Sequence, residues 1–358
     1  MSKNYHIVLS RPFDLDKFDR DSAADACPRH AISMVRHALG AIVHKPEGRE
    51  ITLSDKIWAK IAGGCEPAHW AMARELAATL GSDDIVLTMG EDCGFSLAKR
   101  LVDRNRQGGA PGPRHILHLQ NPDRPRSRLM LKQFKVGDAI DIYASGYPYK
   151  TEFIRQFLNV GEERTHLLSE QTDGKFFTPG QPSGDKKRPV IAGCGLEMRD
   201  YITLAQASGD MDMDVKICAV SPNATARKDT FPESIPDNIY VGYFDWPALR
   251  QLYRDADMVA IPLKPGNYHA GLTVMLEALA CKRPVVMTDS GGLMRSFADK
   301  GLLVATPPQD PIAMKAAIQG VLDDPKAAQE MAERGYDHVM AHHTVEPFVE
   351  NLASLVRG

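Results

Sequence analysis

The chain lacks long apolar runs and any cysteine pattern that marks a metal site or a disulfide framework. No window approaches 18 uninterrupted apolar residues, so we expect no transmembrane helix. The six cysteines are scattered without a C-x-x-C pair, which argues against a zinc site and a disulfide-stapled domain. The opening stretch MSKNYHIVLSRPFDLDKFDR has only a short apolar run and is not expected to be a signal peptide. These absences favour a protein of the reducing cytoplasm.

Several enzyme signatures are also missing from the first half. It has no G-x-G-x-x-G after its first expected strand, which argues against a dinucleotide site there. It lacks G-x-x-x-x-G-K-[ST], H-E-x-x-H and G-x-S-x-G, the patterns of a phosphate-binding loop, a zinc protease and a hydrolase nucleophile. The chemistry of the first half therefore has to be sought in other residues.

What the chain does have is the size and composition of a two-domain globular protein. It has 358 residues, of which 43% are hydrophobic and 25% charged. The net charge of −3 is uneven, because residues 1–182 carry 25 Lys and Arg against 23 Asp and Glu, and residues 183–358 carry 18 against 23. Residues 99–135 hold ten basic and two acidic side chains. Such a basic stretch fits a membrane surface, an anionic substrate or nucleic acid, or simply a solvated loop and helix face.

Short apolar runs alternate with helical stretches in the first half, which predicts a parallel sheet covered on both faces. Residues 32–44 fit a helix, although residues 41–44 also fit the start of a strand. The other expected elements are strands at 6–10, 84–90, 114–121, 138–146 and 165–170, and helices at 66–81, 94–105 and 149–159.

A segment rich in Pro, Gly, Ser and charge, residues 178–189, has linker composition, and the alternation restarts after it. We therefore expect two α/β domains, residues 1–182 and 183–340, followed by a C-terminal segment, residues 341–358, that packs back on the first domain. The expected elements of the second half are strands at 189–195, 215–221, 238–243, 258–263, 283–289 and 302–306, and helices at 199–208, 246–256, 271–281, 311–324, 325–343 and 345–356.

Open parallel sheets bind ligands beyond the carboxyl ends of their strands, where helix N-termini offer N–H groups and a positive dipole. The first such junction is IAGCGLEMRDY, where Gly193 and Gly195 allow close approach of a ligand to the backbone. Arg199 near the expected helix start would bind phosphate oxygens. The simpler alternative is a tight turn beside a surface arginine.

The second junction is KPGNYHAGLTVMLEALACKRPVV. The N–H groups of Gly271, Leu272 and Thr273 would point at an anion at the start of a helix. Glu277 lies further along this otherwise apolar helix, and a buried carboxylate needs a partner such as ribose hydroxyls. The alternative is that Glu277 faces solvent or pairs with a basic side chain.

The third junction is MTDSGGLMRSF, where Ser290, Gly291 and Gly292 form a loop after a strand. The Asp-Ser-Gly-Gly sequence also occurs around a serine-protease nucleophile, but that family is built from β-barrels, so we reject this interpretation. In the first half, Glu91 and Asp92 follow the strand at 84–90, and His118 and Asn121 follow or end the next one. A carboxylate or histidine there would orient an acceptor hydroxyl, although each is as readily an ordinary surface or core residue.

Over residues 190–300 the combined pattern resembles the retaining GT-B glycosyltransferases of the family-four type, or glycosyl transferases group 1. The strongest stretch is PDNIYVGYFDWPALRQLYRDADMVAIPLKPGNYHAGLTVMLEALACKRPVVMTDSGGL, similar to that family's LY..AD helix, proline loop and G…EA.A.G.PVV pattern. The stretch QTDGKFFTP, with Asp173 and Phe177, resembles the family's hinge entry. The resemblance implies GT-B architecture, with two Rossmann-like α/β/α domains facing across a cleft.

The resemblance also implies a nucleotide-sugar donor site in the second domain. Glu277 matches the acid that binds the ribose, and Arg199 matches the basic residue that holds the pyrophosphate. Gly271, Leu272 and Thr273 match the loop that contacts phosphate and sugar, and Gly193 and Gly195 lie in the first donor loop. The nucleotide base is expected to lie near the loop Val241–Phe244, in contact with Gly242, Tyr243 and Phe244.

Three positions depart from the family pattern. The first acid of the family's pair falls on His269, its first-loop arginine on Cys194, and its glycine before PVV on Lys282. A histidine can still hydrogen-bond a sugar hydroxyl. The catalytic set is therefore expected to be Arg199, His269, Glu277 and His118.

The sequence thus predicts a glycosyltransferase that moves a sugar from a UDP- or GDP-sugar to an acceptor hydroxyl, with retention and front-face attack. No metal and no cofactor are expected; Asp212 and Asp214 precede a strand and are interpreted as a turn. Glu91, Asp92, His118 and Asn121 would bind the acceptor, which is a glycan, a lipid-linked sugar or a small molecule. Alternatives are an epimerase-like enzyme on the same scaffold and a non-catalytic binding protein.

The expected partners follow from charge and from the resemblance. They are the nucleotide sugar, the carbohydrate or lipid-linked acceptor, and an anionic membrane touched through residues 99–135, with no nucleic acid. The expected location is the cytoplasm, with peripheral contact at the inner face of the membrane.

Overall fold

The chain divides into two compact units. The computed structural model describes residues 3–62, 65–221, 224–225, 227–266 and 270–358. Unit 1 comprises residues 1–19, 30–169 and 348–358, and unit 2 comprises residues 20–29 and 170–347. The chain therefore passes four times from one unit to the other.

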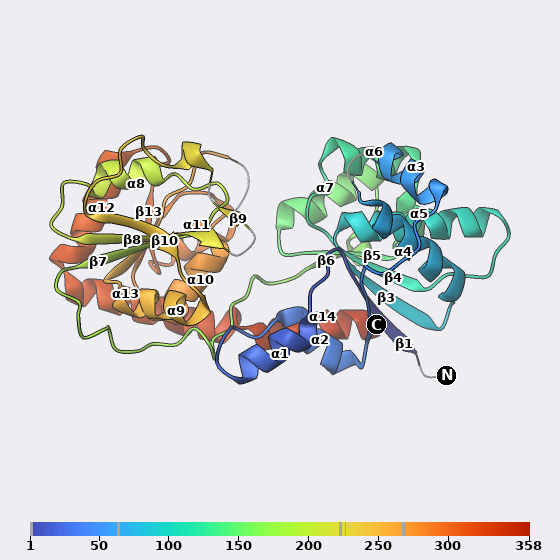
Figure 1. Cartoon of the computed structure of the whole chain (residues 1–358), viewed down its shortest axis with the longest axis horizontal. Helices are drawn as coiled ribbons and strands as arrows, with labels where there is room; N and C mark the ends of the chain where they lie inside the picture. The colour runs from blue at the N-terminus through green and yellow to red at the C-terminus, as the bar shows by residue number, and fades with distance from the viewer. Residues whose placement is uncertain (1–2, 63–64, 222–223, 226, 267–269) are drawn as a thin grey trace. The chain divides into compact units, whose positions relative to one another are not determined.

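Unit 1 is built on a parallel six-stranded sheet with the order β2-β1-β3-β4-β5-β6 (Figure 1). Its strands are buried apolar runs, as in HIVL and DIVLTM, which is typical of a sheet covered on both faces. The strands are β1 (Asn4–Leu9), β2 (Ile42–His44), β3 (Asp84–Met89), β4 (Arg114–His118), β5 (Ile142–Ser145) and β6 (Thr165–Leu167).

Helices cover both faces of this sheet. On one face α4 and α5 pack around Trp70 and Leu97, and α2 lies on the opposite face with the C-terminal helix α14 (Figure 1). The helices are α1 (Leu15–Ala23), α2 (Ala31–Leu39), α3 (Leu53–Ile61), α4 (Pro67–Thr79), α5 (Glu91–Arg106), α6 (Pro125–Gln133), α7 (Pro148–Leu158) and α14 (Val345–Arg357), with short 3₁₀ turns η1 (Val136–Ala139) and η2 (Glu162–Arg164). Helices α1 and α14 each run across a boundary between the units.

Unit 2 repeats the design with the parallel order β10-β8-β7-β11-β12-β13, and β9 pairs antiparallel with β8. The strands are β7 (Val190–Cys194), β8 (Asp214–Ser221), β9 (Ala224–Thr225), β10 (Ile239–Tyr243), β11 (Met258–Ile261), β12 (Val285–Thr288) and β13 (Val304–Thr306). The helices are α8 (Tyr201–Ser208), α9 (Trp246–Asp255), α10 (Leu272–Ala280), α11 (Gly292–Asp299), α12 (Pro311–Asp323) and α13 (Pro325–His342), with the turn η3 (Lys228–Thr230).

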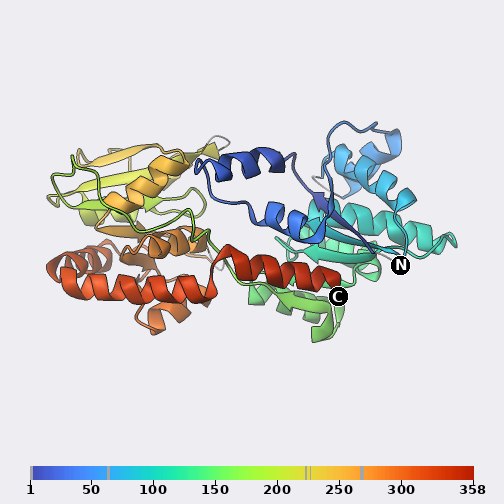
Figure 2. The same cartoon turned by 90° about the horizontal axis from the view of Figure 1, so that it is seen from below.

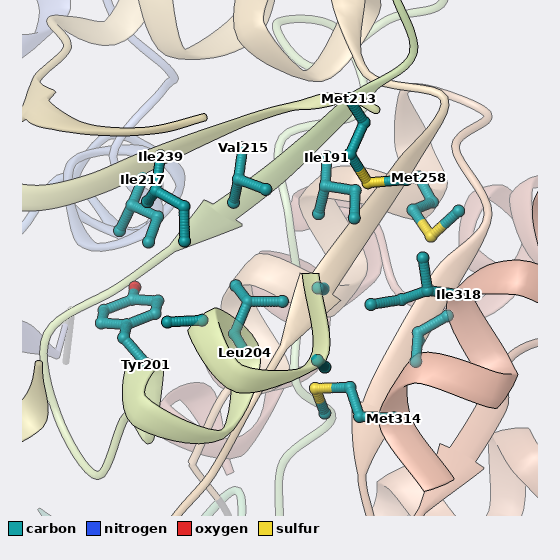
Figure 3. Close-up of a cluster of buried hydrophobic side chains, with 14 of the residues drawn as sticks. Ile191, Tyr201, Leu204, Met213, Val215, Ile217, Ile239, Met258, Met314 and Ile318 are labelled. Atoms are coloured by element: carbon teal, nitrogen blue, oxygen red, sulfur yellow. The ribbon is translucent and has the colours of Figure 1, made fainter. Parts of the chain in front are cut away.

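The core of unit 2 lies between its sheet and two of these helices. Tyr201 and Leu204 of α8 and Met314 and Ile318 of α12 pack against buried strand residues such as Val215 (Figure 3). On the other face the long α13 packs along α10 (Figure 2). Apart from the short β9, both sheets are parallel, and both carry helices, so the expected α/β class is confirmed.

Some expected boundaries were wrong for local reasons. The expected strand at 138–146 begins as the turn η1, because Lys135 adopts a left-handed φ of 52° and turns the chain before β5. Residues 41–44 do leave the helix, since Gly40 ends α2 with a φ of 62° and β2 follows. The helix expected from residue 94 already begins at Glu91, so Glu91 and Asp92 form the first turn of α5. Helices α1, α3 and α6 were not expected.

Two segments distant in sequence complete the units. Asp173 of unit 2 accepts hydrogen bonds from the backbone N–H of Arg29 at 2.7 Å and from its guanidinium Nε at 3.1 Å. In unit 1, Arg114 donates to the carbonyl oxygens of Leu355 and Val356 in α14, at 3.2 and 3.0 Å. Each unit therefore contains residues from both ends of the chain.

Candidate functional site

Three loops of unit 2 meet at the carboxyl edge of its sheet. The backbone N–H of Lys264, after β11, donates to the carbonyl of Met198, after β7, at 2.8 Å. The N–H of Asp200 donates to the carbonyl of Pro262 at 3.0 Å. The N–H of Leu263 donates to Oγ1 of Thr288, at the end of β12, at 3.0 Å. These bonds bring together the three junctions that the sequence singled out.

Arg199 is buried beneath the first of these loops. The helix was expected to begin at Arg199, but α8 begins at Tyr201 with Asp200 as its N-cap, so Arg199 lies before the helix. Its Nε donates to the carbonyl of Cys194 at 2.7 Å and its Nη1 to that of Glu197 at 3.0 Å. These bonds use two of the five guanidinium N–H donors and fix the plane of the group.

Gly195 makes room for this guanidinium. Its φ is 106°, and a Cβ there would collide with Nη2 of Arg199. Its carbonyl accepts a hydrogen bond from the Tyr201 hydroxyl at 2.8 Å. Gly193 differs, because it lies inside β7, where a Cβ would meet Tyr201 and Ile217 at 3.3 Å. Close core packing therefore accounts for Gly193 without a ligand.

Helix α10 presents its N-terminus at the same edge. Gly271 is its N-cap with a φ of 85°, and a Cβ there would lie 2.8 Å from Ile261 and 2.9 Å from Met287. The first-turn N–H groups, including those of Leu272 and Thr273, have no intrahelical acceptor and carry the positive end of the helix dipole. Thr273 is exposed. His269 lies outside the described residues.

Glu277 is buried in α10 and interacts with Tyr253 and Arg199. The Tyr253 hydroxyl, on α9, donates to its Oε2 at 2.8 Å. Burial raises the pKa of Glu277 to about 7, against the opposing effects of the Tyr253 hydrogen bond and the positive charge of Arg199. Near neutral pH this carboxyl is therefore poised between its neutral and ionised forms.

The position of the family's first-loop arginine carries no charge here. Cys194 is buried at the end of β7, next to Cys218 on β8 in register, and burial raises the pKa of its thiol. A neutral thiol cannot replace a cation. Arg199 is a buried cation of this edge, and Lys264 is a second one, whose Nζ lies 3.3 Å from the carbonyl oxygen and 3.5 Å from the carboxylate Oδ2 of Asp229. Lys282 adopts a φ of 55°, which accounts for glycine at this position in the family pattern.

The expected base-binding loop follows an irregular strand end. The register of β10 shifts between Gly242 and Tyr243, and Tyr243 is 52% exposed. Phe244 packs edge-on against Tyr240, with ring centroids 6.1 Å apart. This end of β10 thus presents aromatic surface suited to stacking on a flat ligand.

Unit 1 gathers a second polar cluster at the carboxyl edge of its own sheet. Oε1 of Glu91 accepts hydrogen bonds from the backbone N–H groups of Gln120 and Asn121, at 2.8 and 2.6 Å. Burial raises the pKa of Glu91. The carboxylate thus fixes the loop after β4, beside His118 at the end of that strand. Asp92 pairs with Arg126 instead.

Lys150, at the start of α7, is buried in the same region. Its Nζ lies 3.9 Å from the ring centroid of Tyr147. Burial lowers the pKa of His118 to about 4, and the charge of Lys150 contributes. His118 is therefore neutral near pH 7 and serves as a hydrogen-bond donor or acceptor.

Sequence reasoning missed Tyr253, Lys264 and Lys150. Tyr253 was visible only as part of the LY..AD pattern, and its contact with Glu277 spans 24 residues. Lys264 stands in the quoted proline loop, and Lys150 in an expected helix, without a local signal of burial. Within the described ranges, no group of three His, Cys, Asp or Glu side chains is placed to hold a metal ion. In the same part of the chain, no helix is long and apolar enough to span a bilayer.

Part of this site lies in a segment of the chain that matches a known protein family. Residues 233–338, which include α9, Glu277 and the third junction, match the family described as Glycosyl transferases group 1. The D-inositol 3-phosphate glycosyltransferase of Corynebacterium urealyticum is 32% identical over 262 residues, 65% of this chain and 60% of that protein.

Two solved structures resemble the whole chain. The sucrose-phosphate synthase of Thermosynechococcus elongatus has a TM-score of 0.68 at 16% identity, covering 99% of this chain and 98% of the other. The Anabaena protein HepE, solved in complex with UDP-glucose, has a TM-score of 0.66 at 13% identity, covering 99% of both chains. Likeness at this identity defines the fold.

The fold and the loops at its sheet edges define a protein of the GT-B class. Through residues 233–338 the chain is similar to the group 1 glycosyltransferases. It spans less than two thirds of the length of curated relatives such as the inositol phosphate glycosyltransferases.

Proposed function

We propose that this protein is a glycosyltransferase that uses a nucleoside-diphosphate sugar, of the UDP class, as donor. The observation that carries the proposal is the buried Glu277, placed along α10 from its glycine N-cap within the segment that matches the family. Support for the base comes from the similar fold of HepE, which was solved with UDP-glucose.

The donor would bind along the three loops of unit 2. The diphosphate would accept hydrogen bonds from the first-turn N–H groups of α10 and from Arg199. Glu277 would accept the ribose hydroxyls once ionised. The aromatic surface at Tyr243 and Phe244 would stack on the base. At the start of α10, the backbone N–H groups of Gly271, Leu272 and Thr273 would contact both the phosphate and the sugar.

Glycosyl transfer breaks the bond between the anomeric carbon and the diphosphate oxygen, and the electron pair leaves with the diphosphate. Positive charge develops on the sugar ring and negative charge on the leaving phosphate. Arg199 and the α10 N-terminus would stabilise that negative charge without a metal ion. The acceptor hydroxyl would attack the face that the diphosphate leaves, and its proton would pass to the leaving phosphate oxygen. This route retains the anomeric configuration.

The acceptor would bind in unit 1 at Glu91, Asp92, His118 and Asn121. A neutral His118 would hydrogen-bond a sugar hydroxyl, because its pKa of about 4 keeps it uncharged near pH 7. Lys150 adds positive charge beside it, which favours an acceptor that carries a carboxylate or phosphate.

We also propose that the protein is cytoplasmic and touches an anionic membrane through the basic stretch 99–135. Much of that charge is used internally: Arg104 donates to the carbonyls of Ala77 and Leu80 at 2.7 Å, for example. The exposed basic members of the stretch, which would face lipid, are Arg106, Arg124, Arg128, Lys132 and Lys135.

The donor site is tested by a charge placed at the α10 N-terminus. Thr273→Glu puts a carboxylate beside the first-turn N–H groups, which does not weaken the helix because it complements the dipole. We expect UDP binding, measured by calorimetry, to weaken at least about tenfold, or about 1.4 kcal/mol. Thr273→Gln, of matched size and no charge, is the control.

Equal UDP affinity in both variants and the wild type would overturn the placement of the diphosphate. Failure to bind UDP, GDP and ADP at all would overturn the proposal itself. Turnover of a UDP-sugar without any acceptor would favour an epimerase-like enzyme. Binding without turnover on any acceptor would favour a non-catalytic protein.

A further inference from the structure

Helix α3 of unit 1 exposes an apolar stripe that the fold leaves uncovered. Leu53, Ile57 and Ile61 recur every four residues and are 74%, 48% and 43% exposed. This spacing places them on one side of the helix. Ile51 precedes the helix and is 42% exposed. Exposed large apolar residues are thus concentrated in this segment.

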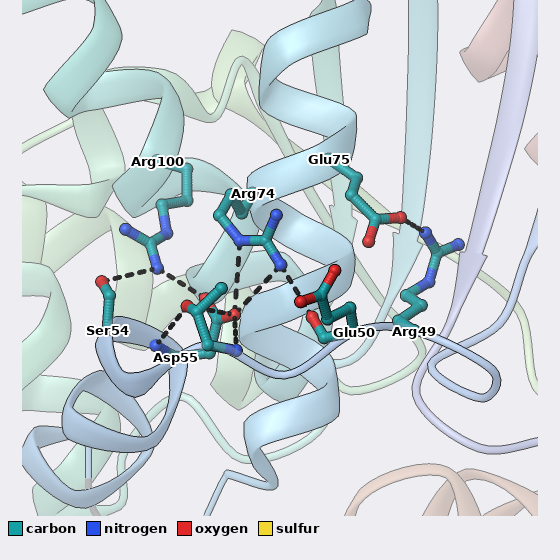
Figure 4. A network of polar contacts seen from close by, with 8 residues as sticks. Arg49, Glu50, Ser54, Asp55, Arg74, Glu75 and Arg100 are labelled. Atoms are coloured by element: carbon teal, nitrogen blue, oxygen red, sulfur yellow. Dashed lines mark hydrogen bonds and ion pairs between the residues drawn. The ribbon is translucent and has the colours of Figure 1, made fainter.

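The opposite side of α3 is firmly held, so the stripe cannot turn inward. Asp55 is fully buried and accepts hydrogen bonds from Arg74 and Arg100, at 3.2 and 2.9 Å (Figure 4). Thr52 and Asp55 form a capping box at the start of the helix. Trp58 stacks on Trp70 with ring centroids 5.3 Å apart.

The charge on the exposed side of α3 is positive. Lys56 and Lys60 lie along one flank of the stripe and are exposed. The helix has one acidic residue, Asp55, and it is buried against its two arginines. The exposed acids nearest in sequence, Glu50 and Glu66, lie beyond the two ends of the helix.

The stripe also borders an apolar hollow. A cavity of about 700 Å³, open to solvent, lies beside Leu53 and Ile57, and Ala59, Cys65 and Pro67 contribute to its wall. The stems of the two lysines complete its lining. Lysine side chains of this kind bury their methylene groups and keep the ammonium group at a polar boundary.

We propose that the exposed side of α3 docks on an anionic lipid bilayer, with Leu53, Ile57 and Ile61 in the acyl region and Lys56 and Lys60 at the lipid phosphates. An apolar stripe flanked by lysines is the composition of a helix that lies in the membrane interface. The exposed side of α3 offers a handful of residues, whereas each partner in a standard protein complex contributes roughly 20 to 30.

This surface differs from residues 99–135, and it does not depend on glycosyl transfer. The test uses the full chain and sedimentation with phosphatidylcholine vesicles, with and without phosphatidylglycerol. We expect binding to the anionic vesicles only. The triple variant Leu53→Gln, Ile57→Gln, Ile61→Gln should bind at least about tenfold more weakly.

The charge is tested separately with Lys56→Gln, Lys60→Gln. Each lysine near an anionic surface contributes about 1 kcal/mol to the free energy of membrane binding, so vesicle affinity should fall about fivefold for each lysine removed. Matched controls are Ile312→Gln, at a residue 82% exposed on α12, and Lys326→Gln on α13, which should bind as the wild type does. Unchanged melting temperatures and UDP affinity would show that every variant is folded.

Three results would overturn the proposal. They are no binding of the wild type to phosphatidylglycerol vesicles, equal binding to those vesicles by the α3 triple variant, and equal binding to those vesicles by the lysine variant. A self-association of the wild type, lost in the triple variant without any vesicle binding, would show instead that a second copy covers the stripe.

Discussion

The hydroxyl of Tyr253 donates a hydrogen bond of 2.8 Å to Oε2 of Glu277, and both side chains are buried between α9 and α10. The same arrangement sets the charge of the carboxyl, because burial raises its pKa and the hydrogen bond opposes that rise. Tyr253 is therefore a positioning residue for the proposed ribose contact.

Tyr253→Phe should destabilise the protein more at high pH than at low pH. The lost donor matters most to the ionised carboxylate, and an unsatisfied buried acceptor costs about 1 to 3 kcal/mol. Urea unfolding at pH 5 and pH 8 measures the difference. Tyr201→Phe is the control, since its hydroxyl bonds the neutral carbonyl of Gly195 and its loss should be equal at both pH values. A pH-independent loss in Tyr253→Phe would contradict the assignment.

Glu277→Gln should stabilise the protein above neutral pH. The folded pKa of about 7 lies above the ordinary 4.5, so the contribution of Glu277 to stability is fully present below pH 4.5 and is lost as pH rises through about 7. The loss is on the order of 3 kcal/mol, and the neutral amide avoids it.

Unfolding of this variant is best followed from pH 4.5 to pH 8.5, beside Glu330→Gln on the exposed side of α13, which should change stability little. UDP affinity should fall in Glu277→Gln although the fold is stronger. If the variant is less stable than the wild type at pH 8.5, the interactions of the ionised Glu277 carboxylate outweigh the cost of its burial, and the prediction is wrong.

Gly195→Ala should lower the free energy of unfolding by at least about 2 kcal/mol. A residue with a Cβ is strained at a φ of 106°, and the added methyl collides with the guanidinium of Arg199. Nucleotide affinity should fall as well, since Arg199 must move. Gly184→Ala, where a Cβ meets nothing within 4 Å, should leave both quantities unchanged.

Asp55→Asn should lower stability by about 2 to 3 kcal/mol, because it leaves Arg74 and Arg100 without their shared carboxylate (Figure 4). Burial alone would raise the pKa of Asp55, but hydrogen bonds from Thr52 and Arg74 hold it below its ordinary value. Its contribution is therefore present above the ordinary value of 3.8 and is lost as pH falls through the folded pKa.

Glu75→Gln is the matched comparison for Asp55→Asn. Glu75 pairs with Arg49 in the same region, but its side chain is 39% exposed, so its loss should cost less than about 1 kcal/mol. Thermal unfolding at pH 7 separates the two variants. Similar losses would show that the burial of Asp55 adds nothing to its ion pairs.

The repeated alternation of strand and helix was enough to predict the fold class and the three junctions of unit 2. Buried strands such as MVAI and VVMT are short apolar runs followed by Gly and Pro, and that signal is local. The placement of Gly271 at a helix start followed from the same local pattern.

Contacts between distant elements could not be predicted in this way. Helix α3 was missed because its large aliphatic residues face outward, so the usual link between periodicity and burial fails. The burial of Asp55 depends on arginines from α4 and α5, 19 and 45 residues away. The contacts of Arg199 with its own loop also required coordinates, because they depend on the left-handed turns at Gly195 and Met198.

The four passages of the chain between the units have a consequence for biosynthesis. Unit 1 needs residues 348–358, where the carbonyls of α14 accept hydrogen bonds from Arg114, and these are synthesised after every residue of unit 2. Unit 2 needs residues 20–29, where Arg29 contacts Asp173, and these are synthesised well before the rest of unit 2. The later half can therefore mature as soon as its own strands are made. Unit 1 must instead wait until residues 348–358 have followed all of unit 2, and meanwhile it is exposed to chaperones and proteases.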